Sequence, residues 1–450
     1  MEFAAGRMLQ NLKEDAFMKK LLSLVLAMLM LMSSFAMAEI DTTIPDGTEI
    51  TFWYSFTGDN ETKLTEQIAA FEAANPGIKV NAQYIGGYNV IHTELASANA
   101  AGVGVPALCV INVPRLTSYA KDNLVEDLTP YIDAFADDIN FDDFYEGMTD
   151  MMNNNGHQTA LPFGQSGQIF YYNKTLLDSL NVTFPTKMEE MDAFLKTVYD
   201  ATGKTVIDIH GTDNAYFYCL FTNMGAFMID TETNETGLAS DVALNLIKKL
   251  REWVDKGYIN WVINDVGNTL MLNFTSGASA ACLYTSSTYA SYKQKAESGA
   301  NGITFEVGIA NQPYGDFGTN HQYVAGATLI IPSADCNTQA QKNAAFKLAS
   351  FLTAPAQQLD WATTSSYYVT RKSAATDPVY ADAYNALLTK LPEMANIDLN
   401  SYVAKTKHEL FDKCGDIFET YMSEIMTNGM DPEEGWELMV EEINDTLADQ

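Results

Sequence analysis

Basic residues are scarce in this chain. Lys and Arg together number 26 against 58 Asp and Glu, which gives a net charge of −32 over 450 residues. Phosphate-backbone binding requires clusters of Lys and Arg, and anionic membrane surfaces repel acidic proteins. The composition therefore argues against nucleic acid and membrane surfaces as partners. Hydrophobic residues make up 47% of the chain, too many for a disordered protein.

Cysteine and histidine, with five residues each, are also sparse. The cysteines form no CxxC pair, which argues against a zinc ribbon or a disulfide framework. We expect the cysteines to be buried and reduced, and one disulfide between two of them is the alternative. They are Cys109, Cys219, Cys282, Cys336 and Cys414. The sequence contains no HExxH spacing, no GxxxxGK[ST] phosphate loop and no GxSxG nucleophile motif. It therefore predicts no metal site, no cofactor and no catalytic residue.

Long hydrophobic runs are missing apart from residues 21–32. This run follows Lys19 and Lys20 and precedes an Ala-x-Ala site ending at Ala38, the pattern of a signal peptide. Twelve residues are too few for a comfortable transmembrane helix, which needs about 20. We expect a leader over residues 1–38, with the true start at Met18. The protein would then be exported, either to a periplasm or to the cell surface and exterior.

Strand and helix patterns alternate in the first third of the mature chain. Short apolar runs at 50–54, 78–85 and 107–112 are separated by helical patterns at 61–74 and 88–101. This order predicts parallel βαβ units in a doubly wound α/β sheet. Such sheets bind ligands beyond the carboxyl ends of their strands. That rule points to Tyr54, Tyr88 and Asn112.

A second α/β set follows residue 161. It has expected strands at 168–172, 279–284 and 326–332 and expected helices at 173–180, 186–201, 242–255, 340–352 and 410–426, with a last helix from Pro432. No repeat and no long linker separates the two sets. We therefore predict two α/β lobes interleaved in one chain.

Aromatic residues are abundant, with 23 Tyr, 23 Phe and 5 Trp. Several tyrosines stand beside small polar residues at expected strand ends, in the clusters Tyr54-Ser55, Gly87-Tyr88-Asn89, residues 284–287 and residues 365–368. A sugar or polyol site needs flat apolar faces for C–H surfaces and fixed partners for hydroxyl groups. These clusters supply both, although each one alone is equally compatible with an ordinary turn.

Three stretches carry a family resemblance: residues 161–174 (LPFGQSGQIFYYNK), 324–333 (VAGATLIIPS) and 351–374 (FLTAPAQQLDWATTSSYYVTRKSA). In this order and spacing they resemble the extracellular solute-binding proteins of ABC importers, in the carbohydrate-binding group, and most closely the glycerol-3-phosphate-binding subfamily. The resemblance implies a type II periplasmic-binding-protein fold that closes around a ligand and delivers it to a membrane permease, as a monomer without enzymatic activity. It implies one lobe of residues 39–164 plus 315–364 and another of residues 165–314 plus 365–450.

The resemblance also implies ligand contacts at particular positions. They are Tyr88, Ser166, Ser286 or Ser287, Gly326 and Tyr367, with an aromatic wall at Tyr216 or Tyr218. Two positions depart from the subfamily: Asn112 stands where it has a glutamate, and Gly415 where it has a phosphate-holding arginine. An arginine clamps phosphate with two hydrogen bonds and a permanent charge.

The loss of that arginine favours a neutral sugar, oligosaccharide or polyol as the ligand. A glycerol-phosphate-type ligand remains the alternative, as do an exported carbohydrate-active enzyme and a sensor or adhesion module built on the same fold.

Overall fold

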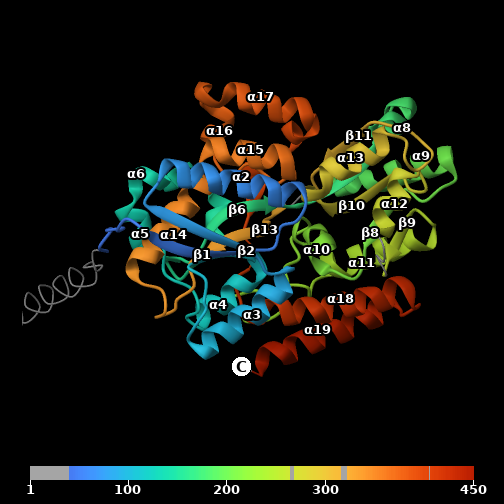
Figure 1. Ribbon diagram of the computed structural model, residues 1–450. Helices are drawn as coiled ribbons and strands as arrows, with labels where there is room; N and C mark the ends of the chain where they lie inside the picture. Colours follow the sequence, from blue (N-terminus) through green and yellow to red (C-terminus); the bar gives the residue numbers. More distant parts are fainter. Residues whose placement is uncertain (1–39, 264–267, 316–321, 405, 450) are drawn as a thin grey trace, which may run out of the picture.

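The computed structural model describes residues 40–449 except 264–267, 316–321 and 405 (Figure 1). The expected leader, residues 1–38, lies outside the described residues. Two separate five-stranded sheets form the frame of the molecule. We call each sheet with the helices packed on it a lobe.

Lobe 1 is built on a sheet with strand order β2-β1-β3-β13-β6. β1 (Thr48–Tyr54) runs parallel to β2 (Ile78–Tyr84) and β3 (Leu108–Asn112), and Phe52 pairs with both Ala82 and Leu108. β13 (Ala325–Ile330) runs antiparallel to β3 and to β6 (Leu161–Ser166). The parallel strands end at the same edge of the sheet, so the residues after β1 and β3 face one region.

Lobe 2 is built on a sheet with strand order β11-β7-β10-β8-β9. β8 (Ile207–His210), β9 (Ile259–Val262) and β10 (Ala281–Thr285) are parallel, whereas β7 (Gln168–Asn173) is antiparallel to β10 and to β11 (Val307–Ala310). Apolar side chains pack on both sheet faces. Buried on both sides, these strands read as continuous apolar runs.

Helices cover both sheets, and their apolar faces follow from residue spacing. In α2 (Asp59–Ala74) the buried residues include Leu64, Ile68 and Phe71, which share one face of a helix. The other helices of lobe 1 include α3 (Tyr88–Ala101), α4 (Leu116–Lys121), α5 (Thr129–Ala134), α6 (Ala136–Ile139), α7 (Glu146–Asp150), α14 (Gln339–Leu352) and α15 (Pro355–Ser365).

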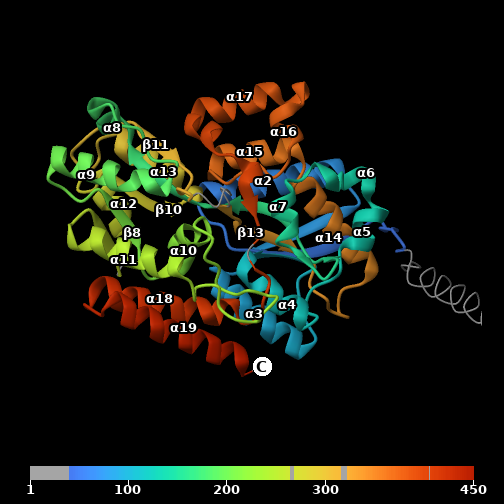
Figure 2. The ribbon, with the colours of Figure 1, turned by 180° about the vertical axis from the view of Figure 1, so that it is seen from behind.

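The lobe 2 sheet is covered by long amphipathic helices with clear start signals. Ser240 caps α11 (Asp241–Asp255) by accepting a hydrogen bond from the Ala243 N–H, and Asp431 caps α19 (Pro432–Ala448). α18 (Phe411–Thr427) lies beside α19 along this lobe, as both views show (Figures 1 and 2). The shorter helices are α8 (Lys174–Leu180), α9 (Met191–Thr202), α10 (Asn214–Thr222), α12 (Thr269–Thr275), α13 (Tyr289–Glu297), α16 (Ser373–Thr376) and α17 (Ala381–Lys390). Short strands complete the set: β4 (Asn153–Asn154) with β5 (His157–Gln158), and β12 (Gln322–Tyr323) with β14 (Tyr402–Val403).

The chain crosses between the lobes where β6 continues into β7 through Gly167. A Cβ on Gly167 would lie 2.4 Å from the Tyr402 ring, so this tight crossing requires glycine. The Tyr368 N–H donates to the Gln165 carbonyl oxygen at 2.7 Å, which ties the segment after α15 to the same crossing. The crossings hold the carboxyl ends of the parallel strands of both lobes close to one another.

The two-lobed α/β fold expected from sequence is confirmed. The expected strands at 50–54, 78–85, 107–112, 168–172 and 279–284 match β1, β2, β3, β7 and β10 within two residues. The expected helix at 186–201 was wrong at its start, because residues 188–190 form a 3₁₀ turn before α9. The cysteines of the described residues form no disulfide, and four of them are buried as expected, but Cys336 is exposed.

Candidate ligand-binding site

Residues that follow parallel strands of the two lobes meet near the crossings. Ser55 follows β1, and Asn112 ends β3; Ser286 and Ser287 follow β10. A cavity of about 550 Å³ lies between the lobes at this place, and its lining includes Thr57, Ser287 and Thr364. We call it the interlobe cavity.

A chain of hydroxyl groups spans the lobes beside this cavity. The hydroxyl of Tyr88, the first residue of α3, lies close enough to those of Ser55 and Tyr367 to interact with both. The Tyr367 hydroxyl in turn interacts with the Ser287 hydroxyl of lobe 2. The structure thus brings together three residues that the sequence selected: Tyr88, Tyr367 and Ser287.

The two tyrosines of this chain lie deep in the protein but keep contact with solvent. Desolvation raises the pKa of both Tyr88 and Tyr367, and that of Tyr367 is raised further by Tyr88. Both side chains are nevertheless only partly buried. This combination describes the wall of a deep cleft. Their hydroxyl groups stay protonated over the physiological range and are able both to donate and to accept hydrogen bonds.

The Tyr367 ring is held rigidly from behind. It stacks on Trp361 with ring centroids 6.2 Å apart and an interplanar angle of 4°, and meets the edge of Phe56. Trp361 is completely buried. Ser366 has a left-handed backbone, with φ of 60°, and its hydroxyl accepts a hydrogen bond from the Ala290 N–H of lobe 2 at 3.0 Å. The ring is therefore fixed before any ligand arrives.

Stacked aromatic rings form a wall in lobe 2. Tyr216, from α10, stacks on Tyr284 with centroids 4.9 Å apart and an angle of 7°, and on His210 at 4.9 Å. Tyr216 was selected from the sequence, and Tyr284 belonged to a tyrosine cluster noted there. His210 is the last residue of β8. It was missed as a site residue because this strand is too short to stand out as an apolar run.

Asn112 is oriented by a partly buried histidine. The Oδ1 atom of Asn112 lies 2.8 Å from Nε2 of His92, and Nδ1 of His92 is bonded to the Tyr119 hydroxyl. Desolvation lowers the pKa of His92, so the ring is neutral. A neutral ring that donates from Nε2 and accepts at Nδ1 satisfies both bonds. This arrangement fixes the side-chain amide of Asn112 at the end of β3.

The other residues selected from the sequence lie at strand ends and crossings. The Tyr54 hydroxyl donates to Glu61 at 2.9 Å. Ser166 and Ser286 are buried, and the Ser286 Oγ accepts a hydrogen bond from the Gly167 N–H at 3.2 Å. Gly326 has φ of +104°, and a Cβ there would lie 2.2 Å from a carbonyl oxygen of β6. Tyr54, Ser166 and Ser286 therefore have internal partners or are enclosed.

Comparison with known families decides the identity of the fold. A family model described as bacterial extracellular solute-binding protein matches residues 66–388. The chain belongs to this family. Its resemblance to solute-binding proteins, inferred from the sequence, is thereby confirmed.

Solved solute-binding proteins share its architecture. The sugar-binding protein MalE from Xanthomonas citri aligns with a TM-score of 0.75 and 19% identity over 89% of this chain and 98% of that one. UgpB from Mycobacterium tuberculosis, solved in complex with glycerophosphocholine, aligns with a TM-score of 0.75 and 20% identity over 89% and 98%.

Among curated relatives, an arabinooligosaccharide-binding protein of Bacillus subtilis is 24% identical over 53% of this chain and 55% of its own length. The chain therefore matches about half the length of that relative.

In this solute-binding protein, the position of the expected phosphate clamp lacks room for an arginine. A Cβ on Gly415 would lie 2.9 Å from the Asn214 side chain at the start of α10. Glu419, one helical turn further along α18, accepts a hydrogen bond from the Asn214 N–H at 3.0 Å. Burial and the nearby charges of Asp213 and Asp416 raise the pKa of Glu419. A phosphate placed here would meet carboxylates in place of a guanidinium.

Two further features concern the described residues of the solute-binding protein. In that part of the chain no helix is long and apolar enough to cross a membrane. Over the same ranges, no group of three or more His, Cys, Asp or Glu side chains is arranged to hold a metal ion.

Proposed function

We propose that this chain is the extracytoplasmic receptor of an ABC importer, which captures a neutral sugar, oligosaccharide or polyol between its lobes and delivers it to a membrane permease. The observation that carries the proposal is the hydroxyl chain from Tyr88 through Tyr367 to Ser287. It links the lobes at the interlobe cavity, where a bound molecule would touch both.

Side chains at the strand ends near the crossings match the chemistry of a sugar. The stacked rings of Tyr216 and Tyr284 offer an aromatic surface to the C–H face of a pyranose or furanose ring. The Tyr88, Tyr367 and Ser287 hydroxyls exchange hydrogen bonds with sugar hydroxyl groups. The oriented amide of Asn112 adds a neutral donor. The interactions that now join the three hydroxyls would be replaced by hydrogen bonds to the ligand.

The proposal includes further contacts near the crossing between the lobes. We assign a ligand contact to the backbone at Gly326, which is only partly buried. Tyr54 and Ser166 support the site from the ends of β1 and β6. Between the two serines we favour Ser287, since Ser286 is completely buried.

Local charge supports a neutral ligand over a phosphorylated one. Glu419 and its acidic neighbours occupy the region where an arginine would be needed to hold a phosphate. The whole chain has a net charge of −32. The name of the arabinooligosaccharide-binding relative and the sugar-binding neighbour MalE also favour carbohydrate. The bound glycerophosphocholine of UgpB makes a glycerol phosphate the ligand to test against.

The remaining parts of the proposal concern architecture and location. We propose lobes of residues 39–164 plus 315–364 and residues 165–314 plus 365–450, hinged at the crossings. We further propose export directed by the leader, function as a monomer, and release of the ligand without chemical change.

Calorimetric titration of the purified protein with neutral sugars and with glycerol 3-phosphate tests the ligand class. We expect saturable binding of at least one neutral arabinose or glucose oligomer and recovery of that sugar intact by chromatography. Tight binding of glycerol 3-phosphate alone, or recovery of a cleaved sugar, would overturn the proposal.

A Glu419→Gln variant sharpens this test. Removal of the carboxylate should raise the affinity for glycerol 3-phosphate and leave that for a neutral sugar within about twofold, because only the phosphate is repelled. Thr197→Trp, on the outer face of α9, is the control.

A further inference from the structure

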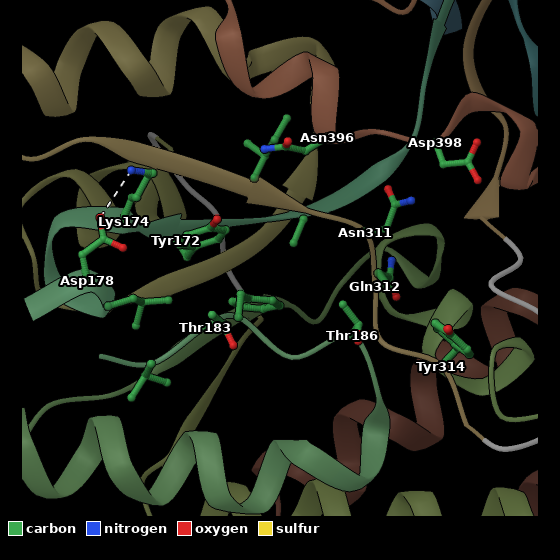
Figure 3. A pocket seen from close by; sticks show the side chains of 15 residues that line it. Tyr172, Lys174, Asp178, Thr183, Thr186, Asn311, Gln312, Tyr314, Asn396 and Asp398 are labelled. Carbon is green, nitrogen blue, oxygen red and sulfur yellow. Dashed lines mark hydrogen bonds and ion pairs between the residues drawn. The ribbon is translucent and has the colours of Figure 1, made fainter. Parts of the chain in front are cut away.

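A second cavity lies outside the interlobe cavity, at the edge strand β11 of lobe 2. Its volume is about 480 Å³, within the range of roughly 300–1,000 Å³ typical of small-molecule sites. It shares no lining residue with the interlobe cavity. Figure 3 shows its walls, which come from β7, the loop before α9, the segment after β11 and the segment around Asn396. We call it the edge cavity.

The edge cavity has buried acceptors that lack donors. Gln312 is 1% exposed, and its Oε1 atom has no hydrogen-bond partner among the described residues; the same holds for the buried Oδ1 atom of Asn311. The Gln312 Nε2 is used internally, donating to the Tyr216 carbonyl oxygen at 3.0 Å. A buried acceptor without a donor costs about 1–3 kcal/mol. Two such acceptors on one cavity wall favour a ligand that supplies hydroxyl donors.

Three charged side chains line the edge cavity, and two of them, Lys174 and Asp178, form an ion pair. Lys174 contacts Asp178 at 3.3 Å, and Asp398 accepts a hydrogen bond from the Asn400 N–H at 3.0 Å. The ammonium of Lys187 lies 3.9 Å above the Tyr314 ring, where it would repel a cationic ligand. Because Lys174, the one cationic lining residue, is already paired, an anionic molecule gains no unpaired positive charge from the lining.

The opposite wall of the edge cavity is aromatic. Tyr172 and Phe184 stack with centroids 5.3 Å apart and an angle of 18°. Tyr172 lies against β11 over Gly308, where a Cβ would come within 2.2 Å of its ring. A fixed aromatic surface opposite hydrogen-bond acceptors suits a molecule with C–H and hydroxyl groups.

We propose that the edge cavity is a second binding site for a small neutral polyhydroxylated molecule, of the size of a monosaccharide or polyol. The proposal is independent of the cleft assignment, because the two cavities have separate walls. Gln312 lines the edge cavity and also donates a hydrogen bond to the backbone of Tyr216, a member of the aromatic wall of lobe 2.

Ligand-observed NMR on the full chain tests this site with D-glucose, L-arabinose and glycerol as probes. In a Tyr367→Ala background, which disables the cleft, we expect saturable binding of at least one probe to persist. Thr186→Trp, at an exposed lining residue, should fill the cavity and abolish that binding. Asn311→Leu, which removes one acceptor, should weaken it about tenfold. Thr197→Trp should leave it unchanged.

Absence of saturable binding in the Tyr367→Ala background overturns the proposal, as does residual binding that neither Thr186→Trp nor Asn311→Leu alters. Saturable binding of ethylammonium with none of the three neutral probes overturns the ligand class. Because cleft binding is measured separately in the wild-type protein, failure of the edge cavity and failure of the proposed receptor function give different results.

Discussion

Removal of a single hydroxyl group, by Tyr367→Phe, is the most direct test of the hydroxyl chain. The phenyl ring keeps its stacking on Trp361, so the packing behind it is preserved. What is lost is the interaction of the Tyr367 hydroxyl with the hydroxyls of Tyr88 and Ser287. Each hydrogen bond contributes about 0.5–1.5 kcal/mol net, and water in the cleft replaces part of it. We expect the free energy of unfolding to fall by about 1 kcal/mol.

Ligand affinity should fall by more than stability. In the complex the Tyr367 hydroxyl is enclosed by ligand, and a sugar hydroxyl left facing a phenyl ring loses a bond that water cannot replace. A loss of about 1–3 kcal/mol corresponds to a dissociation constant roughly 5 to 150 times higher. Calorimetric titration gives the affinity, and urea denaturation gives the stability.

The outcome depends on the difference between the two measurements. Tyr199→Phe, a partly buried tyrosine of α9 in lobe 2, controls for the loss of a hydroxyl elsewhere. An affinity within about twofold of wild type in Tyr367→Phe, with stability reduced, would refute the reasoning. Tyr367 would then be a structural residue of the hinge.

Three further predictions concern stability. Arg371 is 1% exposed and donates to two backbone carbonyl oxygens at 2.7 and 2.8 Å. Arg371→Met should therefore lower the free energy of unfolding, measured by urea denaturation, by about 3 kcal/mol. An effect as small as that of Lys196→Met, a change at an exposed residue, would contradict this prediction. Gly326→Ala should lower the melting temperature by several degrees because its Cβ meets backbone at 2.2 Å, and an unchanged melting curve would argue against the close approach. Burial and Glu61 raise the pKa of Tyr54 to about 12 from a usual value of about 10, so its neutral form stabilises the folded state fully below about pH 10 and less as pH rises toward 12. Tyr54→Phe should therefore reduce the alkaline loss of stability, and an identical pH dependence in the variant would contradict the assignment.

Local patterns in the sequence were sufficient for most of the fold. The helix at 88–101 was predicted with its structural bounds, since its polar turn residues and small-residue pattern mark both ends. Strands β8, β9 and β11 were not predicted. Each has four residues, and so short a run carries too little periodicity to stand out from neighbouring loops.

The candidate site was predicted only in part. Tyr88, Tyr367 and Ser287 were selected by their neighbours in the sequence, and the structure joins them. His92 and His210 were not selected, because a single histidine gives no signal of what it will face. Whether Ser286 or Ser287 is accessible depends on one residue of register after β10, which no pattern resolves.

The sequence alone determined the acidic character, the α/β class and the two interleaved sets of elements, since these depend on composition and on spacing along the chain. Only the tertiary structure decided which hydroxyls meet between the lobes, that Asn214 fills the space beside Gly415, and that buried amide oxygens line the edge cavity. These are contacts between residues far apart in sequence. They depend on how the two sheets are held together at their crossings, and local propensity does not encode that geometry.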